Sequence, residues 1–122
     1  MTSYKDLQVY QKSYERAKEI YEISSRFPVE ERYGLASQIK RAATSIPLNI
    51  AEGYGKGSGG KELKRFLEMA RGSCAEMEVL IAFVKDFRWI TETEGEKLTK
   101  GYEEIGRMLT GLIKAQIQRE AN

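Results

Sequence analysis

Residues 38–53, QIKRAATSIPLNIAEG, place a row of polar residues beside a row of apolar residues at helical spacing. With about 100° per residue, each row falls on one face of a helix. The apolar row is Leu35, Ile39, Ala42, Ile46 and Ile50, and the polar row is Gln38, Arg41, Ser45, Asn49 and Glu52. An exposed helix flank usually mixes Lys and Glu, whereas these side chains are able to satisfy one another or a neighbouring helix. We therefore predict that the polar row, together with Glu76, forms a structural or subunit-contact network.

The same helical spacing extends over most of the chain and predicts four helices. Their expected ranges are about 5–26, 29–54, 60–89 and 92–119. Phe27-Pro28 should end the first helix, because proline cannot continue the hydrogen-bond ladder and restricts the residue before it. Thr91 and Glu94 have the spacing of a capping box at the start of the fourth helix. Short connections then favour one all-α domain over residues 1–122, an up-down-up-down antiparallel four-helix bundle.

Pro47 lies inside the second predicted helix. It lacks the N–H that would bond the carbonyl of Ala43, and a proline in a helix interior costs about 3 kcal/mol relative to alanine. We therefore expect a kink near residues 43–46 that is offset by packing or by a local side-chain hydrogen bond. Ser45 is the candidate for that bond.

Several of these motifs resemble the four-helix-bundle proteins encoded within intervening sequences of bacterial 23S ribosomal RNA genes. The resemblance rests on SIPLNIAEG at 45–53, on Gln38 and Arg41-Ala42-Ala43 before it, and on Gly72-Ser73 with Glu76 after it. It implies a bundle that assembles into homo-oligomeric rings, with a pentamer as the expected form. A related branch, the accessory variability proteins of diversity-generating retroelements, implies a reverse transcriptase and its RNA as partners.

Histidine is absent from the chain, and Cys74 is its single cysteine. These counts exclude Ser-His-Asp and Cys-His catalysis, a cysteine metal cage and an intrachain disulfide. Cys74 itself lies among small residues and is expected to pack in the core. A quartet could still be read as an active site, namely Arg41, Asn49, Glu52 and Glu76. No nucleophile or metal-ligand set accompanies it, so we favour structural pairing and expect no enzyme, cofactor or metal.

Residues 55–61, GKGSGGK, match the G-x-x-x-x-G-K part of a phosphate-binding loop. Glu62 follows where that motif has Ser or Thr, and no strand is predicted before it, so nucleotide hydrolysis is disfavoured. Four cations in and after this loop are our candidate contacts for RNA or DNA phosphates: Lys56, Lys61, Lys64 and Arg65. A merely solvated interhelix loop is the alternative.

Aromatic residues suggest further surfaces. The tyrosines of the first helix, Tyr4, Tyr10, Tyr14 and Tyr21, could stack on bases, although their helical spacing favours a core or a subunit interface. Phe83, Phe87 and Trp89 fall partly off the inward stripe of the third helix and predict an apolar surface for oligomer contact.

The net charge of +2 leaves the function open between two classes of binding protein. The first is a non-enzymatic homo-oligomeric scaffold that binds RNA or DNA through a basic patch repeated around a ring. The alternative is a protein–protein adaptor, such as an accessory subunit of a reverse transcriptase, without direct nucleic-acid binding. No apolar run approaches the roughly 18 residues of a membrane span, and the N-terminus lacks signal-peptide features, so a cytoplasmic location is expected.

Overall fold

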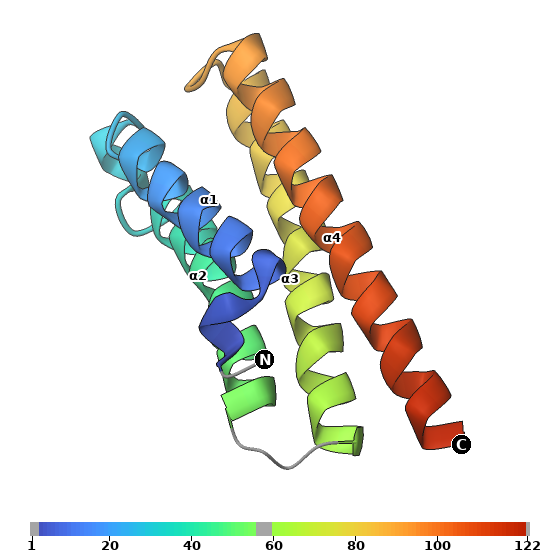
Figure 1. Cartoon of the computed structure of the whole chain (residues 1–122). Coiled ribbons are helices and arrows are strands. Elements are labelled where there is room, and N and C mark those ends of the chain that lie inside the picture. The colour runs from blue at the N-terminus through green and yellow to red at the C-terminus, as the bar shows by residue number, and fades with distance from the viewer. Residues whose placement is uncertain (1–2, 56–59, 122) are drawn as a thin grey trace.

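The computed structural model describes residues 3–55 and 60–121, and in it four long α-helices pack against one another (Figure 1). They are α1 (Gln8–Ser24), α2 (Leu35–Gly55), α3 (Gly60–Asp86) and α4 (Glu92–Ala121). Two short 3-10 helices, η1 (Tyr4–Asp6) and η2 (Val29–Glu31), precede α1 and α2. The described residues contain no strand, so the predicted all-α class with four helices is confirmed.

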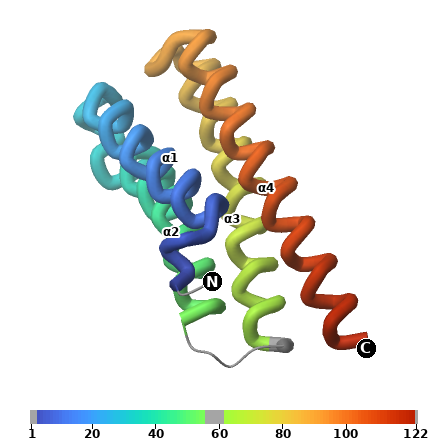
Figure 2. The backbone as a smooth tube through the Cα atoms, in the orientation of Figure 1, coloured from blue at the N-terminus to red at the C-terminus, as the bar shows by residue number. Residues whose placement is uncertain are grey.

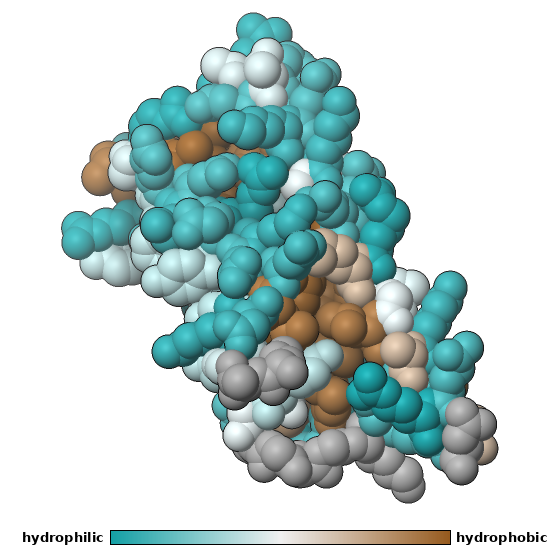
Figure 3. All heavy atoms as spheres, in the orientation of Figure 1, coloured by the Kyte–Doolittle hydropathy of each residue, from teal (hydrophilic) through white to brown (hydrophobic). Residues whose placement is uncertain are grey.

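α1 packs against α2, α3 packs against α4, and the two pairs contact each other mainly through α2 and α3. The α1–α2 and α3–α4 connections lie at one end of the molecule, and the end of α2, the start of α3 and the end of α4 lie at the other (Figure 2). α1 has 17 residues, whereas α3 has 27 and α4 has 30. Since α1 is too short to cover α4 along its whole length, apolar side chains are visible between the start of α1 and the C-terminal half of α4 (Figure 3).

The core consists of the apolar faces of all four helices. Ile39, Ile46 and Ile50 of α2 are fully buried, as the predicted apolar row requires. Other large, fully buried side chains are Ile20, Leu67, Met77, Ile81, Tyr102, Ile105 and Leu109. At the far end of α2, a Cβ on Gly53 would lie only 3.0 Å from Cβ of Phe66, so glycine permits the close approach of α2 and α3 there.

The second helix begins at Leu35, and its predicted start at residue 29 is wrong. Residues 29–31 form η2 instead, and the Glu31 carboxylate accepts a hydrogen bond from the Leu35 amide at 3.0 Å. This side chain satisfies one of the free N–H groups at the start of α2. A Cβ on Gly34 would lie 2.6 Å from Glu31 Oε1, so a larger residue at 34 would displace the capping carboxylate.

The third helix ends at Asp86 and not at residue 89. Arg88 adopts a left-handed conformation with φ 64°, and the Arg88 amide donates to the carbonyl of Lys85 at 2.9 Å. The Trp89 amide donates to the carbonyl of Val84 at 3.0 Å, which completes a Schellman-type helix end. The predicted capping box follows directly, with Glu94 N–H bonded to Thr91 Oγ1 at 3.0 Å and Thr91 N–H bonded to Glu94 Oε1 at 2.9 Å.

α2 continues as a helix through Pro47. The Ser45 hydroxyl donates to the carbonyl of Ala42 at 2.7 Å, so the predicted local side-chain bond forms near the proline. It engages the carbonyl of Ala42 and not that of Ala43, the one that Pro47 leaves without its usual donor. Pro47 itself is buried, so the packing and the local hydrogen bond that were expected as alternatives are both present.

Candidate nucleic-acid and subunit interfaces

Two of the four predicted phosphate contacts fall within the described side chains. Lys64 and Arg65 lie near the start of α3, where Lys64 is half-buried and Arg65 is exposed. Lys56 lies outside the described residues, and only the backbone of Lys61 is described. The structure therefore places adjacent cations at the α2–α3 end of the bundle.

Arg65 already has local partners. Its guanidinium donates to Glu62 Oε2 at 2.9 Å and lies 4.6 Å from the ring centroid of Phe66. The side chains of Arg65 and Glu62 are 56% and 48% exposed, and such surface pairs are weak because water and salt screen them. A phosphate group is therefore able to replace Glu62 as the partner of Arg65 at little cost.

The predicted polar network is only partly assembled within one chain. Ser45 shares a 2.6 Å hydrogen bond with Ser73 of α3, and Asn49 Nδ2 donates to the carbonyl of Ser45 at 2.8 Å. The remaining four residues of the predicted network are exposed: Gln38, Arg41, Glu52 and Glu76. Most of the polar row thus faces outward, beside the buried face of α2.

An aromatic surface lies on α3 and the connection after it. Phe83 and Phe87 are 49% and 50% exposed, with ring centroids 6.0 Å apart. Trp89 is half-buried and lies 5.0 Å from Phe87 and 5.3 Å from Phe27. The predicted outward-facing apolar surface is therefore formed by the two phenylalanines, while Trp89 links it to the core.

A groove of about 490 Å³ between α1 and α2 was not anticipated. Four tyrosines line it along α1 and η1, and α2 closes the opposite side with Pro47 and Leu48. The four are the tyrosines considered above, Tyr4, Tyr10, Tyr14 and Tyr21. Their spacing on one face was visible in the sequence, but the groove also needs Leu48 from α2, which is 65% exposed.

The described residues give no sign of metal chemistry. Within residues 3–55 and 60–121, no group of three or more Cys, Asp or Glu side chains is arranged to hold a metal ion. Burial raises the pKa of Cys74 to about 12, and the charge of Glu78 acts in the same direction, so this thiol is a packed core group. Among the described helices, none has the length and apolar character to span a membrane.

The comparisons with known proteins agree on one family. A family model described as "23S rRNA-intervening sequence protein" matches residues 5–111. A crystal structure from Bacteroides thetaiotaomicron, described as a protein with unknown function from the S23 ribosomal protein family, superposes with a TM-score of 0.79. The two chains are 26% identical, and the match covers 87% of this chain and 95% of that one. No curated protein matches this chain.

Proposed function

Because this chain belongs to the 23S rRNA-intervening sequence protein family, we propose that it is a non-enzymatic, homo-oligomeric scaffold that binds RNA or DNA. In this proposal, up-down-up-down bundles assemble into a ring, with a pentamer as the expected form. One observation carries it: α2 and α3 expose polar and aromatic side chains beside their buried rows, with Arg41 of the polar row and Phe83 of α3 among them.

Two chemically different surfaces support assembly into a ring. The outward polar row of α2, with Arg41 and Asn49, offers hydrogen bonds that fix the register between subunits. The Phe83–Phe87 surface of α3 offers apolar area to be buried. Each of these surfaces would meet a different surface of the neighbouring subunit, and such heterologous contacts form closed rings when the rotation between subunits permits.

A ring would repeat Lys64 and Arg65 once per subunit. Each pair of cations alone would bind phosphate weakly, but several pairs presented together raise the avidity without any new type of contact. Binding that depends on phosphate contacts releases counterions and therefore weakens steeply as salt is added. The proposal accordingly predicts salt-sensitive binding with little preference for base sequence.

Asn49→Leu tests the assembly. We expect the variant to keep its helical circular dichroism and to fall to a lower mass in light scattering, because leucine cannot supply the amide hydrogen bonds of the polar row. Tyr33→Ala is the control, since Tyr33 is 87% exposed and lies between η2 and α2. An unchanged mass for the Asn49 variant would contradict a role for the polar row in subunit contact.

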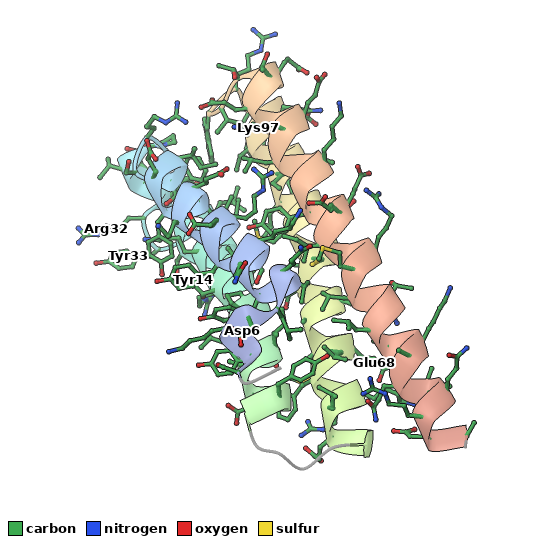
Figure 4. The ribbon with its side chains drawn as sticks, in the orientation of Figure 1. Asp6, Tyr14, Arg32, Tyr33, Glu68 and Lys97 are labelled. Carbon is green, nitrogen blue, oxygen red and sulfur yellow. The ribbon has the colours of Figure 1, made fainter. Side chains whose placement is uncertain are left out.

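The double variant Lys64→Gln, Arg65→Gln tests the nucleic-acid surface. Fluorescence anisotropy with labelled RNA and DNA should show an affinity about tenfold lower at low salt and a shallower salt dependence. Lys97→Gln removes one positive charge at the opposite end of the bundle (Figure 4) and should leave the affinity and its salt dependence unchanged. Absence of binding by the wild-type assembly, or binding indifferent to salt, would refute this function.

The exposed Phe83–Phe87 surface also favours a second candidate function, the protein–protein adaptor. In that case another protein, for example a reverse transcriptase, would cover the two phenylalanines. A defined oligomer that ignores RNA and DNA, together with capture of a purified reverse transcriptase that Phe83→Ser abolishes, would favour the adaptor over the nucleic-acid scaffold.

A further inference from the structure

We propose that the groove between α1 and α2 binds unpaired bases of single-stranded nucleic acid. This inference rests on the proposed nucleic-acid binding and adds the form of the ligand and a second contact surface. The surface lies beside Pro47 and Leu48, apart from the cations at the start of α3.

The tyrosines give the groove its capacity for stacking. The ring centroids of Tyr4 and Tyr10 are 5.0 Å apart, and those of Tyr10 and Tyr14 are 5.9 Å apart. Tyr14 and Tyr21 are 49% and 51% exposed, so part of each residue is open to a ligand. Every base has a flat aromatic face, and stacking on an exposed ring therefore binds single strands with little regard for sequence.

The charges at the groove favour an anionic occupant. Lys18 Nζ lies 5.8 Å from the Tyr14 ring centroid, and Lys40 Nζ lies 5.4 Å from that of Tyr21. Among the described residues that line the groove, Lys18 is charged and none is a carboxylate. A ligand with flat apolar groups and a negative backbone matches this combination of exposed rings and lysines.

Lys18 and Tyr10 are both able to face a phosphate group. Lys18 pairs with Glu15 at 3.4 Å, but both side chains are more than 60% exposed, so a phosphate is able to displace the carboxylate. Burial raises the pKa of Tyr10 above its ordinary value, and the neighbouring phenols of Tyr4 and Tyr14 raise it further. The phenol of Tyr10 is therefore neutral at physiological pH and does not repel phosphate.

Stacking on the tyrosine rings distinguishes single strands from duplexes. The exposed rings of Tyr14 and Tyr21 lie along α1, in a groove bounded on its other side by α2. Bases inside a duplex are already stacked and paired, and their faces cannot reach a protein ring without being extruded. Unpaired bases reach such rings at no cost in base pairing.

The experiment compares labelled oligo(U) and oligo(dT) with a duplex in fluorescence anisotropy. Tyr14→Ala and Tyr21→Ala should each weaken single-strand binding about tenfold and leave duplex binding unchanged. Tyr14→Phe and Tyr21→Phe keep the ring and should bind like the wild type. Tyr33→Ala is the matched control, because Tyr33 is exposed and is not among the residues that line the groove.

A second variant guards against misfolding of the tyrosine variants. Leu48→Glu adds a carboxylate to the groove at a position that is 65% exposed, and should weaken single-strand binding more than its neutral counterpart Leu48→Gln. If the proposal is right, the tyrosine and Leu48 variants should also keep the mass and the helical circular dichroism of the wild type.

The outcomes separate this inference from the function on which it rests. Salt-sensitive binding of single strands and duplexes alike, unaffected by the tyrosine and Leu48 variants, would overturn the groove and leave the basic patch in place. A wild-type protein that binds no nucleic acid would overturn both. Loss of oligomer mass in Tyr14→Ala would show that a second copy of the chain occupies the groove, and would also overturn the inference.

Discussion

The inward and outward faces of α2 share one helix but differ in every other respect. Ile39 and Ile46 are fully buried against the other helices, whereas Leu48 is 65% exposed and Arg41 is exposed. The inward face removes apolar area from water and supports the bundle. The outward face gains little from folding of the single chain, and it is the face that the proposed function assigns to contacts with other molecules.

The largest effect on the free energy of unfolding is expected for a substitution of Ile46 on the inward face. Ile46→Ala should lower the free energy of unfolding by about 2–5 kcal/mol, because it removes buried methyl groups and leaves a cavity. Leu48→Ala, two positions along the same helix, should change that free energy by less than about 0.5 kcal/mol. Both values come from urea or guanidinium unfolding followed by circular dichroism. Similar losses for the two variants would mean that Leu48 is covered in the folded assembly.

Tyr102 of α4 carries a polar group on the inward side of the bundle. Its side chain is fully buried, and its hydroxyl has no hydrogen-bond partner among the described residues. A buried hydroxyl that lacks a partner costs about 1–3 kcal/mol. Tyr102→Phe should therefore raise the free energy of unfolding by about 1 kcal/mol, measured in the same denaturant experiment. A decrease would show that the hydroxyl stabilises the folded state.

The buried phenol of Tyr102 also predicts that the free energy of unfolding falls at alkaline pH. Burial raises the pKa of Tyr102 above its ordinary value of 10.0, with Cys74 adding to the rise and Arg16 opposing it. The stability from the neutral phenol is fully present below pH 10 and is lost at higher pH, because the unfolded chain ionises first. Tyr102→Phe should make this decline shallower, and the remaining slope belongs in part to the buried thiol of Cys74.

Helical periodicity predicted the apolar rows and the capping box because both depend on residues close in sequence. The boundaries it missed depend on particular local contacts. Glu31 caps α2 from outside the helix, and Arg88 adopts at the end of α3 a left-handed conformation that usually indicates glycine. Neither contact has a signal in the spacing of apolar residues, so the predicted ends of these helices lay outside the observed ones.

The candidate surfaces were predictable to different degrees for a related reason. The sequence places polar residues on one stripe of α2, but whether the stripe meets a neighbour depends on the rotation of α3, which brings Ser73 onto Ser45. The tyrosine groove likewise needs the relative position of α1 and α2. One-helix patterns define faces, and the pairing of faces is decided by packing of the whole bundle.

The smallest predicted effect is at the Arg26–Glu94 contact, which lies on the surface like the outward face of α2. The hydrogen bond from Arg26 at 2.6 Å, followed by that from the Thr91 amide, lowers the pKa of Glu94 below its ordinary value of 4.5. The stability from the ionised form is therefore present above pH 4.5 and is lost as the pH falls through the lowered pKa. The two side chains are 49% and 34% exposed, so Glu94→Gln should cost less than about 1 kcal/mol at neutral pH and less at acidic pH. Glu96→Gln, on the same exposed turn, is the control. A loss for Glu94→Gln as large as that for Ile46→Ala would show that this contact, and not only the inward faces, holds the helices together.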